Sequence, residues 1–112
     1  MDKLITSSSI TRQWLNNIVS EVKKRISSVR YKESKHYASL KNSATGKIFV
    51  HLNPQPHQIR LFTPLDQLYD TVLRPSRSGW KHFLSVFVIK SEDMIDKAID
   101  LIISSYEEDC HR

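Results

Sequence analysis

The stretch from His82 to Ile89 constrains the fold more than any other part of the chain. Its alternation predicts a β-strand, because successive side chains of a strand point to opposite faces of a sheet. Both faces of this strand are apolar, one carrying Leu84, Val86 and Val88 and the other Phe83, Phe87 and Ile89. A strand with two apolar faces belongs in the middle of a sheet or beneath covering layers. The chain must therefore build a sheet around it.

An amphipathic helix is predicted at the start of the chain. Apolar residues recur there at spacings of three and four, at Ile10, Trp14, Ile18, Val22, Ile26 and Val29. That spacing places them on one face of an α-helix. Ser7 to Ser9 supply candidate N-caps. We expect this helix to pack on the sheet.

Three short strands are expected next. After Tyr31 the period becomes two, so that His36, Ala38 and Leu40 share one face while Tyr37, Ser39 and Lys41 share the other. Residues 42–46 read as a turn, since Asn and Gly tolerate positive φ. Further strands are expected over residues 48–52 and 57–62, separated by the breaker Asn53-Pro54-Gln55-Pro56. The short connections favour an antiparallel meander.

Two further elements complete the predicted order. Residues 63–73 favour a short helix or helical turn over coil. Ser91-Glu92-Asp93 caps a closing helix, whose first turn carries two carboxylates where the helix dipole favours them. The fold class predicted is α+β: one domain over residues 1–112 with an ordered core of about 9–108, in which a mainly antiparallel sheet of about four strands is flanked by an N-terminal and a C-terminal helix.

Charge is divided unevenly along the chain. Residues 1–90 hold 15 Lys and Arg against 5 Asp and Glu, whereas residues 91–112 hold 2 against 7. Between Lys23 and Lys41 there are seven basic residues and one acid, Glu33. Such a basic region suits phosphate, an anionic surface or an acidic protein, and the alternative is a solvated face that keeps the protein soluble.

Several classes of function find no support. The longest nearly apolar run is far shorter than a membrane span, and the amino terminus carries no apolar signal core, so a cytoplasmic protein without a membrane partner is expected. The single Cys110 predicts an inert reduced thiol. With only Gly46 and Gly79, no phosphate-binding glycine loop can be written. No cofactor is expected.

Catalytic and metal sites are equally weak in the sequence. The five histidines lack the close spacing of helical zinc motifs, although His36, His51 and His82 would meet if their strands were neighbours. No local signature of an activated nucleophile occurs. We therefore expect neither a metal site nor catalytic residues.

The loop Leu73 to His82 is the best candidate binding site. Arg74 and Arg77 can each hold a phosphate or carboxylate, and Trp80 can offer a flat ring to a base. The alternative for Trp80 is a place in the core. The predicted nucleic-acid-binding residues are Lys23, Lys24, Arg30, Lys35, Arg74, Arg77, Trp80 and Lys81.

The carboxyl half of the chain resembles a small family. Gly79-Trp80, the strand to Ile89, Ser91-Glu92-Asp93 and the helix end Ser105-Tyr106-Glu107 resemble domain of unknown function 5655, which ends chains labelled predicted transport proteins. A more distant likeness is to YjbR-like double-wing proteins. The second resemblance implies an α+β fold and DNA binding. Neither family supplies catalytic residues.

Three hypotheses follow. The first is a non-enzymatic module that binds nucleic acid, specifically DNA, through the basic residues and the Arg/Trp loop. The second is a protein-interaction or self-assembly domain, in which the basic body meets the acidic closing helix of a neighbour. The third, a small enzyme, would need His82 or His51 beside a carboxylate.

Overall fold

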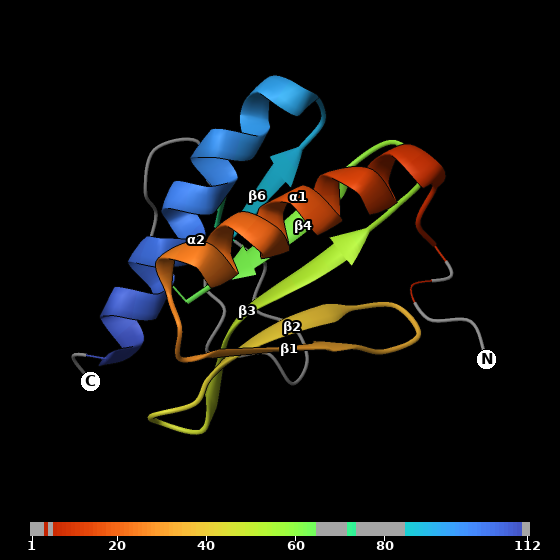
Figure 1. Ribbon diagram of the computed structural model, residues 1–112. Coiled ribbons are helices and arrows are strands. Elements are labelled where there is room, and N and C mark those ends of the chain that lie inside the picture. Colours follow the sequence, from red (N-terminus) through yellow and green to blue (C-terminus); the bar gives the residue numbers. More distant parts are fainter. Residues whose placement is uncertain (1–3, 5, 65–71, 74–84, 111–112) are drawn as a thin grey trace.

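The structure is a computed structural model, which describes residue 4 and residues 6–64, 72–73 and 85–110. Helix α1 (Ser9–Arg25) and helix α2 (Ile95–Cys110) lie beside one twisted antiparallel sheet (Figure 1). The strands are β1 Val29–Glu33, β2 Ala38–Asn42, β3 Lys47–Pro54, β4 Ile59–Thr63, β5 Val72–Leu73 and β6 Ser85–Ile89. Their order across the sheet is β1-β2-β3-β4-β6-β5. The predicted α+β class is confirmed.

The two helices cover the same face of the sheet. The ring of Phe49 on β3 lies 5.5 Å from that of Tyr106 on α2, centroid to centroid. At one end of β2, Asn42 Nδ2 donates to the Asp109 carboxylate of α2 over 2.9 Å. The core between the two layers is apolar and includes Leu15, Ile18, Leu40, Leu52, Leu61, Phe87 and Ile102. Burial of such side chains supplies most of the free energy that holds the layers together.

Helix α1 begins where the sequence predicts and ends earlier. Ser8 is its N-cap and forms a capping box with Thr11, which satisfies two backbone N–H groups. The helix ends at Arg25, and Ile26 is already extended, with φ −131° and ψ 111°. The expected continuation to Val29 is wrong, because Val29 opens strand β1. Ile26 is still buried. Its place in the apolar spacing therefore reflects burial in the core and does not indicate that the helix continues.

The sheet has more strands than expected. Five strands contain five or more residues, against about four predicted, and the two-residue β5 pairs with β6. The additional strand is β1, which pairs along its whole length with β2. Strand β3 also runs on through Asn53 and Pro54, which were expected to break it. Most of the helical turn expected over 63–73 lies outside the described residues.

The closing helix lies where it was predicted, but its start differs. Ser91 precedes a 3₁₀ turn, η1 (Glu92–Met94), which holds the two expected carboxylates, and the Ser91 side chain makes no capping hydrogen bond. Helix α2 follows directly, with Asp96 in its first turn. Its buried residues, Ile95, Ala98, Ile99, Leu101, Ile102, Ser105 and Asp109, face the sheet. Near its end the buried Asp109 carboxylate accepts from Asn42 and, over 2.6 Å, from Thr45 Oγ1. These bonds fasten the helix end to the turn between β2 and β3.

Candidate nucleic-acid interface

The face of the sheet turned away from the helices carries basic side chains. On β1, Glu33 lies against Arg12 of α1 and Tyr31 lies beneath Lys23, so both point to the helices. Strand alternation then turns Arg30 and Lys32 the other way, and both are exposed. We call this the distal face. In the described strands its residues include Arg30, Lys32, Ser39, Lys41, Ile48, His51, Arg60, Phe62, Val86 and Val88.

Two cations face each other directly across this face. Arg30 on β1 is the register partner of Lys41 on β2. Side chains in such positions have Cβ atoms about 5 Å apart, and like charges there destabilise a sheet. Lys32 follows two residues along β1, on the same side as Arg30. Three exposed positive charges are thus gathered on neighbouring strands.

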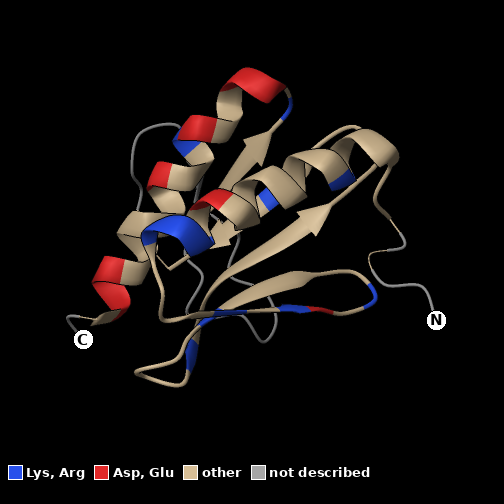
Figure 2. Ribbon diagram, in the orientation of Figure 1, with Lys and Arg blue, Asp and Glu red and all other residues tan. Residues whose placement is uncertain are grey.

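The described carboxylates all lie on the other side of the molecule. The acids sit on α1, η1 and α2, apart from Glu33, which points to α1 (Figure 2). Within the described ranges, no carboxylate comes within 4.0 Å of Arg30, Lys32 or Lys41. Residues 65–71 and 74–84, which include two further acids, lie outside the described residues, and this statement does not cover them. The described part of the distal face is therefore positive without internal compensation.

Toward β4 and β6 the distal face becomes apolar. The guanidinium of Arg60 lies 5.1 Å from the centroid of the Phe62 ring, an arrangement that stabilises a cation over an aromatic face. Phe62 is only 4% exposed. Its ring therefore cannot serve as a platform for a ligand, whereas the half-buried Arg60, which lies opposite Asn53, adds a separate cation to this face.

The cations of the helix layer are placed differently. Lys24 Nζ and Arg25 Nε each lie 3.6 Å from the Glu21 carboxylate, and Arg25 Nη1 lies 4.0 Å from Asp100 of α2. Lys23 Nζ lies 5.6 Å from the centroid of the Tyr31 ring. At the end of α1 these charges also complement the helix dipole. Their positions have a structural explanation.

A compact cluster beneath α1 ties β1 to that helix. Arg12 Nη1 lies 2.9 Å from Glu33 Oε2, and the Tyr31 hydroxyl donates to the same oxygen over 2.6 Å. The pKa of Tyr31 is raised well above its ordinary value. Burial is the larger cause, and the hydrogen bond to the Glu33 carboxylate is the second. Glu33 is thus engaged on the helix side and leaves the charges of the distal face uncompensated.

The predicted binding residues divide among three places. Lys23 and Lys24 lie on α1, Arg30 lies on the distal face, and the exposed Lys35 lies in the turn between β1 and β2. The structure does not bring the helix pair together with Arg30, because they lie on opposite sides of the sheet. The other four predicted residues, Arg74, Arg77, Trp80 and Lys81, lie outside the described residues.

Sequence reasoning missed three members of the distal face. Lys32, Lys41 and Arg60 were not among the predicted site residues. Lys32 could have been found from the alternation of Val29 to Glu33, in which every second residue is basic. For Lys41 the face was predicted correctly, together with Tyr37 and Ser39. What was missing was the strand β1 that brings Arg30 beside it.

The described residues offer little support for the enzyme hypothesis. His51 Nδ1 and Ser39 Oγ are 3.1 Å apart on the distal face, which is a hydrogen bond between a potential base and a potential nucleophile. The described carboxylates face the helix layer and cannot orient this pair. His82 lies outside the described residues. In the described ranges no group of three or more His, Cys, Asp or Glu could hold a metal ion, and no helix is long and apolar enough to cross a membrane.

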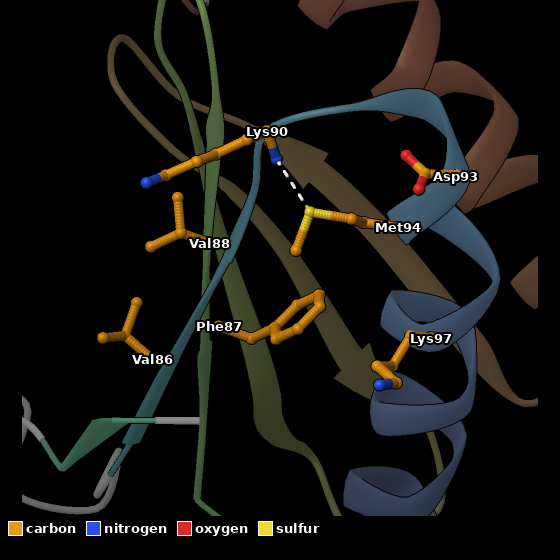
Figure 3. A pocket seen from close by; sticks show the side chains of 7 residues that line it. All are labelled: Val86, Phe87, Val88, Lys90, Asp93, Met94 and Lys97. Atoms are coloured by element: carbon orange, nitrogen blue, oxygen red, sulfur yellow. Dashed lines mark hydrogen bonds between the residues drawn. The ribbon is translucent and has the colours of Figure 1, made fainter. Parts of the chain in front are cut away.

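A pocket of about 540 Å³ lies beside β6 and η1. Its lining is Val86, Phe87, Val88, Lys90, Asp93, Met94 and Lys97 (Figure 3). Phe87 points toward α2, whereas Val86 and Val88 point to the distal face. The backbone N–H of Lys90 donates to Met94 Sδ over 3.4 Å, which closes the turn into η1. The lining of this pocket is mainly apolar, and the polar groups among the lining residues do not converge on a point where a ligand would bind.

Comparison with known proteins adds no relative. Protein-family models, curated proteins and solved structures give no significant match to this chain. The resemblances to domain of unknown function 5655 and to YjbR-like proteins therefore stay predictions.

Proposed function

We propose that the protein is a non-enzymatic module that binds nucleic acid through the distal face of its sheet. The observation that carries this proposal is the uncompensated pair of Arg30 and Lys41, with Lys32 beside them. Like charges held directly opposite each other cost stability. A row of phosphates between them would turn that repulsion into attraction. The helix-layer cations need no such ligand, since their neighbours already stabilise them.

The proposal predicts a moderate salt dependence. If Arg30, Lys32, Lys41 and Arg60 each contact one phosphate, log K should fall against log salt with a slope of about −3 on single strands and about −3.5 on duplex DNA. Loss of each contact should reduce that slope by about 0.7 to 0.9. The slope therefore counts the contacts independently of the affinity.

A matched pair of triple variants locates the site. The distal variant is Arg30→Gln/Lys32→Gln/Lys41→Gln, and the control is Lys23→Gln/Lys24→Gln/Arg25→Gln in the helix layer. Each removes one Arg and two Lys, so net charge changes equally. Anisotropy of labelled single-stranded and duplex oligonucleotides is measured at two salt concentrations. We expect the distal variant to lose about tenfold or more in affinity and to flatten the slope to about −1, while the control keeps most of both.

Two results would count against the proposal. Equal losses in both variants would mean that only net charge matters and that no face is used. An absence of binding by the unchanged protein at low salt would exclude nucleic acid as the partner. Circular dichroism of each variant checks that the fold survives the substitutions.

The second candidate is protein interaction or self-assembly. It is favoured by the same separation of charge, because the exposed acids of α2, among them Asp96, Asp100 and Glu107, complement the distal face of another copy. Contact between two different surfaces is open-ended and would build chains of molecules. Sedimentation at low salt should then show mass that grows with concentration, and a monomer throughout would exclude this form.

A further inference from the structure

Aromatic rings lie next to the cations of the distal face. The ring of Tyr37 meets those of His36 and His51 edge to face, with centroids 6.5 Å and 6.3 Å apart. His51 is held in turn by Ser39 at 3.1 Å. Tyr37 and His51 are half-buried and His36 is exposed, so each keeps accessible surface. A supported ring with an accessible part can serve as a stacking platform.

The register places these rings in line with the basic residues. Tyr37, Ser39 and Lys41 follow each other at every second position, which is about 7 Å per step along a strand. Ser39 has Lys32 opposite on β1 and His51 opposite on β3. Lys41 and Arg30 therefore lie on one side of this cross-strand row, and Tyr37 lies on the other. The cations thus lie on β1 and at one end of β2, and the rings lie at the other end of β2 and on β3.

This surface is too broad for a groove of duplex DNA. The major groove is about 12 Å wide and admits a helix or a two-stranded ribbon. Strands β1 to β3 lie about 4.8 Å apart and continue sideways into β4. A duplex could reach the cations only with its outer phosphates, and its bases would stay stacked on each other. In a single strand the bases are free to leave the backbone and stack on a protein ring.

We infer that the distal face binds single-stranded nucleic acid, with phosphates at Arg30, Lys32 and Lys41 and an unpaired base stacked on the ring of Tyr37, which the ring of His51 contacts in a T-shaped arrangement. This inference rests on the proposed function and narrows its ligand. Stacking does not depend on base identity, so binding should be tolerant of sequence. The two candidate strands differ in the 2′-hydroxyl of RNA and in the 5-methyl group of thymine in DNA, and the DNA and RNA arms of the experiment separate them.

The first experiment uses the unchanged protein. Its affinity is measured for a mixed-sequence 12-mer as single-stranded DNA, as RNA, as duplex DNA, and as a strand with consecutive abasic sites. The abasic strand keeps every phosphate and removes the stacking partners. We expect the base-bearing strands to bind about tenfold or more tightly than the duplex and the abasic strand, in line with the usual loss per stacked base.

The second experiment tests the ring itself. Tyr37→Phe keeps a ring, whereas Tyr37→Leu keeps an apolar side chain without one. We expect Tyr37→Leu to lose about 5- to 100-fold on the base-bearing strand and little on the abasic strand, and Tyr37→Phe to bind nearly as the unchanged protein does. Ile48→Ala, at an exposed apolar position of the same face, is the control. Thermal unfolding reports whether each variant is folded.

Different results would overturn the stacking of a base on Tyr37 and the binding of nucleic acid by the distal face. Equal binding of duplex, abasic and base-bearing strands would overturn the stacking inference, yet the distal triple variant would still test the cationic face. Equal losses of Tyr37→Leu on both strands would also overturn it. An absence of binding to every probe at low salt would overturn the proposed function itself.

Discussion

The helix layer and the distal face use the same residue types in opposite ways. In the helix layer Arg12, Lys24 and Arg25 each have a carboxylate within 4.0 Å. On the distal face Arg30 and Lys41 are opposed to each other. The first arrangement follows from folding alone. The second works against folding, and departures of that kind are expected where a surface meets something outside the molecule.

The largest effect should come from removing a buried charge of the helix layer. Asp109→Ala removes the carboxylate that accepts from Asn42 and Thr45 and leaves Asn42 Nδ2 only the weaker contact with Cys110 Sγ, so we expect the free energy of unfolding to fall by about 2 to 3 kcal/mol. Urea unfolding measures it. Glu107→Ala, exposed on the same helix, should change stability by less than about 0.5 kcal/mol. Equal effects would mean that the Asp109 contacts contribute nothing.

A smaller effect is expected at the cluster beneath α1. Glu33→Gln keeps the shape and weakens both the contact with Arg12 and the bond from Tyr31, which should cost about 1 kcal/mol. The neighbouring Lys32→Gln, on the distal face, should leave stability within about 0.5 kcal/mol. Chemical denaturation gives the free energy of unfolding of both variants, one altered on the helix side of β1 and the other on the distal face. A larger loss of stability for Lys32→Gln than for Glu33→Gln would contradict this prediction.

Replacing a lysine by glutamate should change stability in opposite directions on the distal face and in the helix layer. Lys41→Glu places an acid opposite Arg30, so we expect stability to rise by about 0.5 kcal/mol while nucleic-acid affinity falls. Lys24→Glu repels Glu21 one helical turn away and should lower stability by about 0.3 kcal/mol. Thermal unfolding measures the stability of each variant, and fluorescence anisotropy measures its affinity for nucleic acid. A stability loss at Lys41 would mean that its ammonium stabilises the sheet.

The smallest effect concerns Tyr31 at alkaline pH. Its pKa is higher in the folded state than the ordinary value of about 10 in an unfolded chain. The stability this provides is complete below about pH 10 and is lost as the pH rises toward the folded pKa. Tyr31→Phe should therefore lose stability less steeply between about pH 10 and 11. Parallel slopes in denaturation experiments would contradict a raised pKa.

The sequence predicted those elements whose local pattern has one interpretation. The closing helix combines early acids with a continuous apolar stripe, and these signals agree with one another, although the serine expected to cap it makes no side-chain capping bond. Ser7 to Ser9 likewise marked the start of α1, where Ser8 is the N-cap. For β1 two patterns compete, since Val29 continues the helical spacing from Ile26 and also begins a strand alternation. Pairing with β2, a contact distant from the local pattern, decides between them.

The candidate site was less predictable than the fold. Alternation shows that Lys41 and Ala38 lie on opposite faces, but it cannot show which face the helices cover. Nor can it show that Arg30 lies opposite Lys41, because that depends on register. Charge density along the chain instead grouped Arg30 with Lys23 and Lys24, from which the sheet separates it. Linear proximity is a poor guide to a shared surface.

The placement of the described acids on the helix layer has a consequence for diffusion. A molecule with positive charge on one face and negative charge on the other carries an electric dipole across its thickness. In the field of a polyanion such a molecule turns its positive face forward before any contact forms. Removing acids from α2 would then alter the rate of encounter more than the rate of escape, although α2 touches no ligand.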